Sequence, residues 1–374
     1  MNKKKIIIVC RSFYPDISPR SFRATELAKE LARQGHEVIV CLPRNNYDYT
    51  PLQNEYGIIF KFMPPIKWKP VPIIEKGILY WPSRILRRIL QLMLEYPDIE
   101  LIFKVKRMLK KENGFDLLIS IAVPYPIHWG VALVRSHKNP IAKVWIADCG
   151  DPFYFNTLDS FKKPFYFAFI EKFSFKKANY ITIPFDSLKK YFFKEFHNKI
   201  RIIPQGFKFE IINTVKNDPI NVKPRFAYAG SIAMNGIRSP FKLIEILLQI
   251  DKDYEFHIFT LSKSNLLEEY AEKSKNKIVI HNSLQRSDLI PILSKMDFLV
   301  NLLVNGTELK QIPSKLIDYS LAGRPILNID PINPNKEILI QFLNGNYQNA
   351  FYVKNIEQYR IENVCEKFLE LLPS

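Results

Sequence analysis

The sequence predicts an α/β protein with two doubly wound parallel-sheet domains. Its 374 residues are too many for one core of ordinary size. Short apolar runs alternate with amphipathic helical stretches in both halves of the chain, the pattern of parallel sheets covered on both faces. This alternation is interrupted at the polar stretch Asn213–Lys223. We therefore predict domains at 1–207 and 224–374 joined by a linker at 208–223, with the last helix free to pack back on the first domain.

The first half begins with a strand at Ile6–Cys10 and a helix at Ser21–Gln34. Apolar residues from Ala24 to Ala32 recur at helical spacing, and Gly35 is suited to end the helix. Further apolar runs predict the remaining strands of this domain: Glu37–Leu42, Leu117–Ile121, Ala142–Ala147, Tyr180–Ile183 and Ile200–Ile203.

The second half repeats the pattern after the linker. Its predicted strands are Arg225–Ala229, Tyr254–Thr260, Ile278–His281, Phe298–Leu302 and Pro325–Asn328. Its predicted helices are Pro240–Ile250, Asn265–Lys275, Ser287–Lys295 and Ser314–Ala322. Ligands of such sheets bind beyond the carboxyl ends of the strands, so the loops that follow strands are the expected site.

The charge of the chain indicates an anionic partner. Lysine and arginine number 54 against 37 acidic residues, a formal charge of +17. A phosphorylated metabolite or a lipid surface fits this excess. Nucleic acid is the least supported partner, because RNA-binding signatures are missing, and we expect none.

The cysteines and the apolar runs indicate the cellular compartment and argue against metal and disulfide sites. The four cysteines (Cys10, Cys41, Cys149 and Cys365) form no CxxC pair, which favours free thiols over a metal site or a disulfide framework. Arg11 stops the first apolar run before a signal-peptide core is complete. The longest apolar stretch, Leu117–Val134, contains two prolines and predicts strand, loop and helix, not a membrane span. We expect a cytoplasmic protein.

The most informative stretch follows the strand at Phe298–Leu302. Ser314 opens a short helix there, and free N–H groups at a helix start suit a phosphate. Lys315 adds a full charge, and Asp318 lies one turn later, placed to accept hydrogen bonds from a ribose. The alternative is that Ser314 only caps the helix and Asp318 is a solvated helix residue. The predicted donor-binding residues of this segment are Lys310, Gln311, Pro313, Ser314, Lys315 and Asp318.

Two runs in this stretch, Pro313–Tyr319 and Ala322–Ile326, resemble the donor-binding segment of retaining glycosyltransferases of family four, the kind found in surface or capsular polysaccharide biosynthesis. The resemblance implies the GT-B fold, two Rossmann-like domains facing a cleft. It also implies that the helix start holds the donor diphosphate and that Asp318 binds the ribose. The family's usual signature has two glutamates separated by seven residues. Here Lys310 stands at the first position, and Glu308 is a candidate replacement from a shifted loop.

The same resemblance extends to the loops of the first domain. Asp16 lies in a loop that faces the acceptor in relatives, and Asp151 lies in a segment similar to their Asp-x-x-Asp-Pro-Trp. His128 follows a strand end where relatives often have a histidine near the transferred sugar. These three are the predicted catalytic residues. For each, the alternative is an ordinary structural role in a turn, a loop or the core. Arg20 and Arg23 are candidates for phosphate contact or, equally, surface residues.

The start of the second domain also resembles the family. Ala229-Gly230-Ser231 is similar to the turn where relatives carry Gly-Arg and, further along, a lysine for the diphosphate. Ser231 takes the arginine position, and Arg238 is the nearest cation to the lysine position. Gly230, Ser231 and Arg238 therefore join the predicted donor site. No GxGxxG follows the first strand, which argues against a nicotinamide or flavin enzyme, and we expect neither cofactor nor metal.

The segment Arg84–Lys111 combines large apolar residues with cations. A basic amphipathic helix can lie in the headgroup layer of an anionic membrane, which would suit a lipid-linked acceptor and a peripheral position at the inner face of the membrane. The alternative is two ordinary domain helices with solvated cationic faces.

These observations predict transfer of a glycosyl unit from a nucleoside-diphosphate sugar to a hydroxyl of a glycan or lipid-linked oligosaccharide. Retention of configuration is implied by the resemblance alone. Two alternatives stay open. One is a sugar-nucleotide epimerase of similar fold, and the other is a degenerate, non-catalytic subunit that binds the nucleotide sugar.

Overall fold

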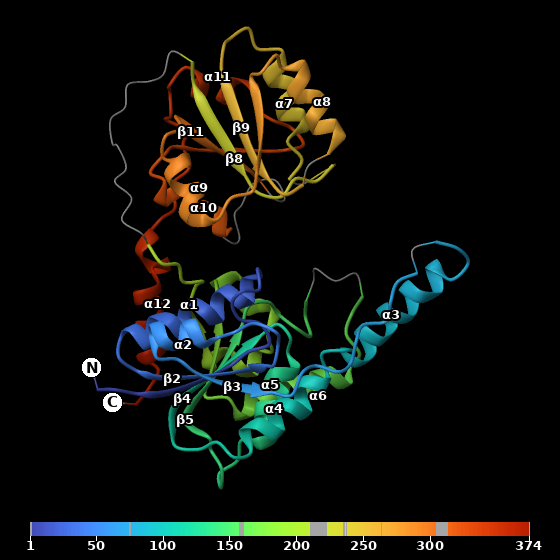
Figure 1. The fold of residues 1–374 in the computed structure, drawn as a ribbon, viewed down its shortest axis with the longest axis vertical. Coiled ribbons are helices and arrows are strands. Elements are labelled where there is room, and N and C mark those ends of the chain that lie inside the picture. Colours follow the sequence, from blue (N-terminus) through green and yellow to red (C-terminus); the bar gives the residue numbers. More distant parts are fainter. Residues whose placement is uncertain are drawn as a thin grey trace. The chain divides into compact units, whose positions relative to one another are not determined.

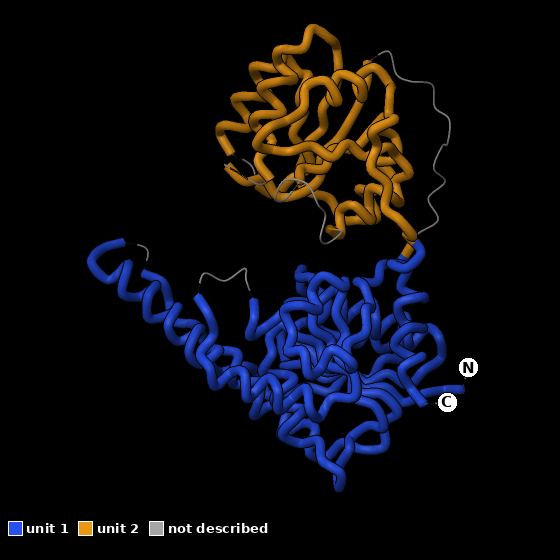
Figure 2. The backbone as a smooth tube through the Cα atoms, turned by 180° about the vertical axis from the view of Figure 1, so that it is seen from behind, with its two compact units in different colours: residues 1–208, 357–374 blue, residues 209–356 orange. Residues whose placement is uncertain are grey.

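The computed structural model describes residues 2–74, 76–156, 161–209, 223–234, 236, 238–262, 264–303 and 313–373. The chain forms two compact units (Figure 2). Unit 1 comprises Met1–Lys208 and Glu357–Ser374, and unit 2 comprises Phe209–Ile356. The second unit thus ends earlier than the predicted domain 224–374, because the last helix folds with unit 1.

Unit 1 contains a seven-stranded sheet of order β3-β2-β1-β4-β5-β6-β7, parallel throughout (Figure 1). In its centre, Ile6 of β1 pairs with Val38 of β2 on one side and with Leu117 of β4 on the other. These strands are almost continuously apolar because helices bury both faces. The strands are β1 Lys5–Val9, β2 Glu37–Pro43, β3 Ile59–Met63, β4 Phe115–Ala122, β5 Ala142–Cys149, β6 Tyr180–Ile183 and β7 Ile200–Ile202.

Helices cover both faces of this sheet. Side chains of α1, α2 and α12 form one core cluster, and those of α4, α5 and α6 form the other. The last helix, α12, packs on α1, and Phe207 pairs with Arg360 in a short parallel bridge that leads the chain back into unit 1. The helices are α1 Pro19–Arg33, α2 Thr50–Tyr56, α3 Tyr80–Leu94, α4 Glu100–Leu109, α5 Pro126–Val134, α6 Tyr166–Lys177 and α12 Ile361–Leu369, with 3-10 turns at Asp186–Tyr191, Lys194–Lys199 and Ile356–Tyr359.

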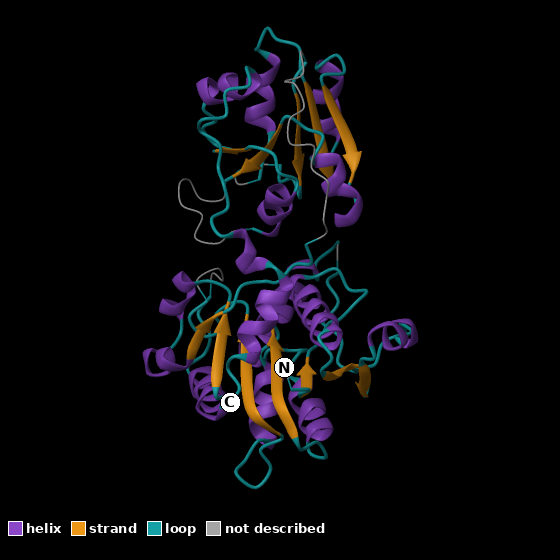
Figure 3. Cartoon of the chain, turned by 90° about the vertical axis from the view of Figure 1, so that its left-hand side faces the viewer, coloured by secondary structure: helices purple, strands orange, loops and turns teal. Residues whose placement is uncertain are grey.

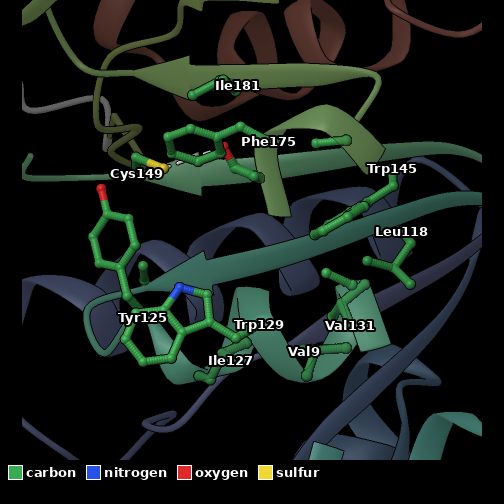
Figure 4. Close-up of a cluster of buried hydrophobic side chains, with 14 of the residues drawn as sticks. Val9, Leu118, Tyr125, Ile127, Trp129, Val131, Trp145, Cys149, Phe175 and Ile181 are labelled. Atoms are coloured by element: carbon green, nitrogen blue, oxygen red, sulfur yellow. Dashed lines mark hydrogen bonds between the residues drawn. The ribbon is translucent and has the colours of Figure 1, made fainter. Parts of the chain in front are cut away.

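Aromatic residues fill the core between the sheet and α5 (Figure 4). Trp129 of α5 stacks on Phe167 of α6 with ring centroids 5.6 Å apart. Trp145 of β5 is fully buried, and its indole N–H donates to the Ser120 hydroxyl at 2.8 Å. A buried tryptophan needs a hydrogen-bond acceptor for its indole N–H, and Trp145 has one inside this packed core.

Unit 2 is a smaller doubly wound unit with a five-stranded parallel sheet of order β10-β9-β8-β11-β12 (Figure 3). Helices α7, α8 and α11 pack on one face, and α9 and α10 pack on the other. The strands are β8 Arg225–Ala229, β9 Glu255–Thr260, β10 Ile278–Asn282, β11 Phe298–Leu302 and β12 Ile326–Ile329. The helices are α7 Phe241–Leu248, α8 Asn265–Lys273, α9 Arg286–Leu293, α10 Ser314–Leu321 and α11 Lys336–Leu343.

Two parallel α/β units therefore stand where the sequence predicts them. Within the described residues, no helix has both the length and the apolar character that crossing a membrane requires.

Candidate functional site

The candidate site lies at the carboxyl ends of β8 and β11 in unit 2, where α10 begins. Pro313 occupies the N-cap position with an extended backbone, and no described side chain caps the helix. Ser314 is the first helical residue and is exposed, so its hydroxyl does not act as the cap. The first N–H groups of α10 are thus available to an anion.

Tyr319 fixes α10 against the end of β8. Its buried hydroxyl accepts the Ala229 N–H at 2.7 Å and donates to the Ala229 carbonyl at 3.3 Å. Gly230 follows with φ +148°, and a Cβ there would lie 3.2 Å from the Tyr228 hydroxyl. That hydroxyl donates to the Ser231 carbonyl at 2.7 Å. A glycine is required because the backbone turns sharply over the Tyr228 side chain.

Lys315 lies over Tyr228, and the charge of Arg238 is nearby. The Lys315 Nζ lies 4.9 Å from the centre of the Tyr228 ring. Burial, reinforced by the nearby charge of Arg238, lowers the pKa of Lys315 to about 8. Among the described residues, no carboxylate forms an ion pair with Lys315 or Arg238. The structure thus brings Arg238, the nearest cation to the predicted lysine position, to the start of α10.

Asp318 lies one turn along α10 and is held by an arginine that the sequence did not single out. The Arg286 Nε donates to the Asp318 Oδ1 at 2.5 Å. Burial raises the pKa of Asp318, and the charge of Arg286 opposes that rise. Arg286 opens α9 after β10, at the same edge of the sheet. Its place at a helix start after a strand was the signal that could have found it.

The predicted donor-binding residues divide into two groups. Gly230, Ser231, Arg238, Lys315 and Asp318 gather at this edge, together with Pro313 and Ser314. Lys310 and Gln311, as well as Glu308, lie outside the described residues. Chemically, the gathered residues offer free helix amides, a partly buried lysine with an exposed arginine nearby, and a carboxylate that can accept hydroxyl hydrogens.

In unit 1, the corresponding edge carries a buried ion pair. Arg23 of α1 contacts Asp148 of β5 through two bonds, Nη2 to Oδ1 at 2.9 Å and Nε to Oδ2 at 3.1 Å. Thr182 donates to the same carboxylate at 2.7 Å. Burial works against the charged carboxylate, but Arg23 and Thr182 more than offset it and hold the pKa of Asp148 below its ordinary value. Arg23 also donates to the carbonyls of Ile203 and Pro204, so the structure uses it internally.

Arg20 and Asp151 lie at the same edge. Their side chains approach to 3.8 Å, and a Cβ at Gly150 would lie 1.6 Å from the Arg20 Cζ, so only glycine admits the guanidinium there. The Asp151 carbonyl accepts the Tyr125 hydroxyl at 2.7 Å, whereas its carboxylate is about half exposed. Asp151 therefore shapes the loop through its backbone and still presents its side chain. Asp16 is exposed in the first loop, where its N–H donates to the Phe13 carbonyl.

His128 is placed differently from the other two predicted catalytic residues. The ring is fully buried, with Nδ1 2.8 Å from the Ser120 hydroxyl and Nε2 3.5 Å from the Cys149 sulfur. Burial lowers the pKa of His128 to about 4. In this geometry the imidazole is neutral at physiological pH and has no exposed atom to offer a substrate, which favours the structural alternative over the catalytic one.

The family model described as Glycosyltransferase Family 4 matches residues 22–210, just over half of the chain. The chain belongs to glycosyltransferase family 4. This membership makes it a transferase and favours transfer over the epimerase and the non-catalytic subunit that the sequence left open. No curated protein sequence matches the chain.

Solved structures share the fold over nearly the full length. The apo lipopolysaccharide outer core galactosyltransferase WaaB is 12% identical with a TM-score of 0.59, covering 98% of both chains. A glycosyltransferase from Rickettsia africae is 14% identical with a TM-score of 0.60, covering 100% of this chain and 95% of its own. Anabaena Alr3699/HepE, in complex with UDP and glucose, is 11% identical with a TM-score of 0.57, covering 98% of both. These likenesses confirm the predicted GT-B fold of the family 4 enzyme.

Proposed function

We propose that this family 4 enzyme transfers a glycosyl unit from a nucleoside-diphosphate sugar to a hydroxyl of a glycan or lipid-linked oligosaccharide in surface polysaccharide biosynthesis, with retention of configuration. The observation that carries the proposal is the pair Lys315 and Arg238 at the sheet edge of unit 2, with no carboxylate partner among the described residues. The Anabaena structure, which contains UDP and glucose, supports a nucleotide-sugar donor.

The leaving group of this reaction is a nucleoside diphosphate, so the site must stabilise charge that develops on phosphate oxygens. The first amides of α10 and the partly buried Lys315 supply that charge complement, and Arg238 adds a second, exposed cation. Electrostatic interactions at the partly buried position of Lys315 are stronger than in water. Asp318 accepts ribose hydroxyls while Arg286 holds the orientation of its carboxylate. Gly230 and Ser231 let the donor approach the backbone, and Lys310 and Gln311 complete the proposed set.

On the acceptor side, Asp16 and Asp151 are the proposed contacts, because both present carboxylates at the edge of unit 1. His128 contributes in this scheme only structurally, by contacting Ser120 of β4 and Cys149 of β5 inside the core. The scheme uses neither a metal nor an organic cofactor. We also propose that the enzyme works in the cytoplasm, at the inner face of a membrane.

A thermal-shift screen with UDP, GDP, ADP, dTDP and their sugars tests the donor proposal. A ligand at 100 times its dissociation constant stabilises the folded state by about 2.7 kcal/mol, which is readily measured. We expect one nucleotide class to raise the melting temperature of the wild type and of Lys295→Met, which changes an exposed lysine of the same unit. Lys315→Met should abolish most of the shift. An equal shift in all three proteins, or none with any nucleotide, would contradict the proposal.

A further inference from the structure

Helix α3 is exposed along its whole length. Of its residues, only Ser83 is buried. Large apolar side chains on the helix face solvent, among them Trp81 with 66% of its surface exposed and Ile85 with 54%. Figures 1 and 2 show α3 projecting from the body of unit 1. Monomeric soluble proteins rarely leave such a contiguous apolar surface uncovered without a use for it.

The exposed helix is strongly amphipathic. Arg84, Arg87, Arg88 and Gln91 recur three and four residues apart and form one face. Trp81, Ile85, Ile89 and Leu92 form the opposite face, which Leu86 and Met93 widen. No acidic residue occurs between Tyr80 and Leu94. The helix thus pairs a broad apolar face with a polar face whose only charges are cationic.

A row of phenylalanines lies in the segment next to α3. Phe165, Phe169 and Phe173 are spaced four residues apart at the start of α6 and along it, and Phe165 and Phe169 are 72% and 68% exposed. The two segments are in contact, because the Tyr166 hydroxyl donates to the Met93 carbonyl of α3, and the Arg88 guanidinium lies 5.7 Å from the Phe161 ring centre. We call the set Trp81, Ile85, Leu86, Ile89, Met93, Phe161, Phe165 and Phe169 the α3–α6 surface.

Among the described residues, the acidic groups next to the α3–α6 surface are paired or buried. Glu95, just after α3, pairs with Lys163. Glu171, the only acid of α6, is fully buried, and burial raises its pKa to about 8. Lys162 and Lys176 add cations around the phenylalanines, whereas Lys172 pairs with Glu195 at 2.9 Å. The neighbourhood of the surface therefore carries net positive charge.

Helix α4 does not share these properties, although its sequence looks alike. Leu101, Val105 and Leu109 are buried in the core of unit 1. Lys104 is also buried, where it pairs with Glu100 at 2.9 Å and donates to the Pro65 carbonyl at 2.8 Å. Within the basic segment Arg84–Lys111, the uncovered amphipathic helix is α3, whereas α4 is a domain helix with a solvated cationic face.

We propose that the α3–α6 surface docks the enzyme on an anionic membrane. The apolar face of α3 and the phenylalanines enter the boundary between headgroups and acyl chains, and the arginines reach the lipid phosphates. Charge complementarity decides for this occupant: the arginines and surrounding lysines repel a second copy of the same cationic surface but match an anionic headgroup layer. Docking of this kind rests on the proposed function, because its use is to bring the enzyme to a lipid-linked acceptor.

Vesicle flotation with the full chain tests the docking. We expect binding to phosphatidylcholine vesicles that contain about 30% phosphatidylglycerol, and binding at least tenfold weaker to phosphatidylcholine alone. The double variant Ile85→Ser/Ile89→Ser should lose more than tenfold of the binding to mixed vesicles. Arg84→Gln/Arg87→Gln should lose roughly 25-fold, because each arginine near an anionic surface contributes about fivefold. These side chains are exposed, so neither variant removes a core contact.

The matched control is Lys106→Gln/Arg107→Gln, which removes the same charge from exposed positions on α4 and should leave binding unchanged. All variants should keep the nucleotide-induced thermal shift of the wild type, so that failure of docking and failure of the donor proposal are told apart. An equal loss in the α4 control, or no loss in the α3 variants, would overturn the proposal. So would self-association of the wild type without vesicles that Ile85→Ser/Ile89→Ser abolishes.

Discussion

The two units carry similar parallel sheets but treat the charges at their carboxyl edges differently. In unit 1, Arg23 is buried against Asp148 and two backbone carbonyls, so its charge is fully matched inside the protein. In unit 2, Lys315 is partly buried near a second cation, Arg238, and lacks a carboxylate partner among the described residues.

This difference separates architecture from binding. A buried charge with an internal counterion joins the helix and the strand that carry the two residues. Removing one partner destabilises the fold, because the other charge is then buried without a counterion. A buried charge beside a like charge is unfavourable until an anion arrives, and such perturbed groups concentrate at functional sites. We therefore propose the edge of unit 2 as the site of the donor diphosphate, whereas the Arg23–Asp148 pair belongs to the scaffold of unit 1.

The largest expected effect comes from breaking the matched pair. Asp148→Ala leaves the Arg23 guanidinium buried without its counterion, which should lower the free energy of unfolding by about 3–5 kcal/mol. The exposed neighbour Asp151 is the control, because Asp151→Ala removes a surface contact of about 0–1 kcal/mol. Urea denaturation followed by circular dichroism measures both. A small, equal effect of the two substitutions would show that the pair is not a structural element.

Removing the unmatched cation should affect the reaction and not the fold. Lys315→Met should lower the rate of transfer by about a hundredfold, roughly 3 kcal/mol of transition-state stabilisation, with unfolding little changed. Lys295→Met serves as the matched control and should keep the wild-type rate. Steady-state release of nucleoside diphosphate in the presence of acceptor measures this. A Lys315→Met enzyme that is as active as the control would remove the basis of the comparison.

A substitution at Asp318 distinguishes binding of the ribose from binding of the phosphates. Asp318→Asn should weaken binding of a nucleoside diphosphate by about 30-fold, about 2 kcal/mol, which is the usual contribution of a hydrogen bond to a charged group. Pyrophosphate, which lacks the ribose, should bind the variant and the wild type alike. Competition calorimetry distinguishes the two ligands. Equal weakening of both would place Asp318 at the phosphates and contradict its assignment to the ribose.

The smallest effect is expected at His128. His128→Leu removes one of the two partners of the buried Ser120 hydroxyl, the other being Trp145, which should lower the free energy of unfolding by about 1–3 kcal/mol. The rate of transfer by the remaining folded enzyme should stay within about threefold of wild type, because no atom of the ring is exposed to a substrate. A hundredfold loss of rate at unchanged stability would restore the catalytic role that the sequence suggested.

Strong periodicity explains why much of the fold could be predicted. The first helix, with its apolar stripe from Ala24 to Leu31, lies within two residues of its predicted bounds. The edge strand Ile59–Met63 was not predicted, although four of its five residues are apolar; in the structure only Met63 among them is buried. The short helix Thr50–Tyr56 buries only Leu52, so its sequence carries no apolar stripe from which it could be predicted.

The site was only partly predictable, because a motif shows neighbours in sequence and not partners in space. Lys315 and Asp318 stand at a helix start and were found from that position. The partner of Asp318, Arg286, lies 32 residues away, and Asp148 lies 125 residues from Arg23. Such long-range pairs decide which charges are matched, and composition and spacing do not encode them.

Proton uptake on nucleotide binding is the most direct test of whether the donor diphosphate contacts Lys315. Free Lys315, with its pKa lowered to about 8, is mostly neutral at about pH 9, and a bound diphosphate favours its charged form. Binding at that pH should therefore take up a proton, and affinity should fall as the pH rises through the pKa of Lys315. The nucleotide phosphates do not contribute, because their last pKa is near about 6.

Calorimetric titration with the nucleoside diphosphate selected by the thermal-shift screen, in two buffers of different ionisation enthalpy, measures the uptake. We predict a substantial fraction of one proton per wild-type molecule at about pH 9 and almost none for Lys315→Met. Tight binding by the wild type with no proton uptake, or equal uptake by the variant, would mean that the diphosphate does not rest on Lys315.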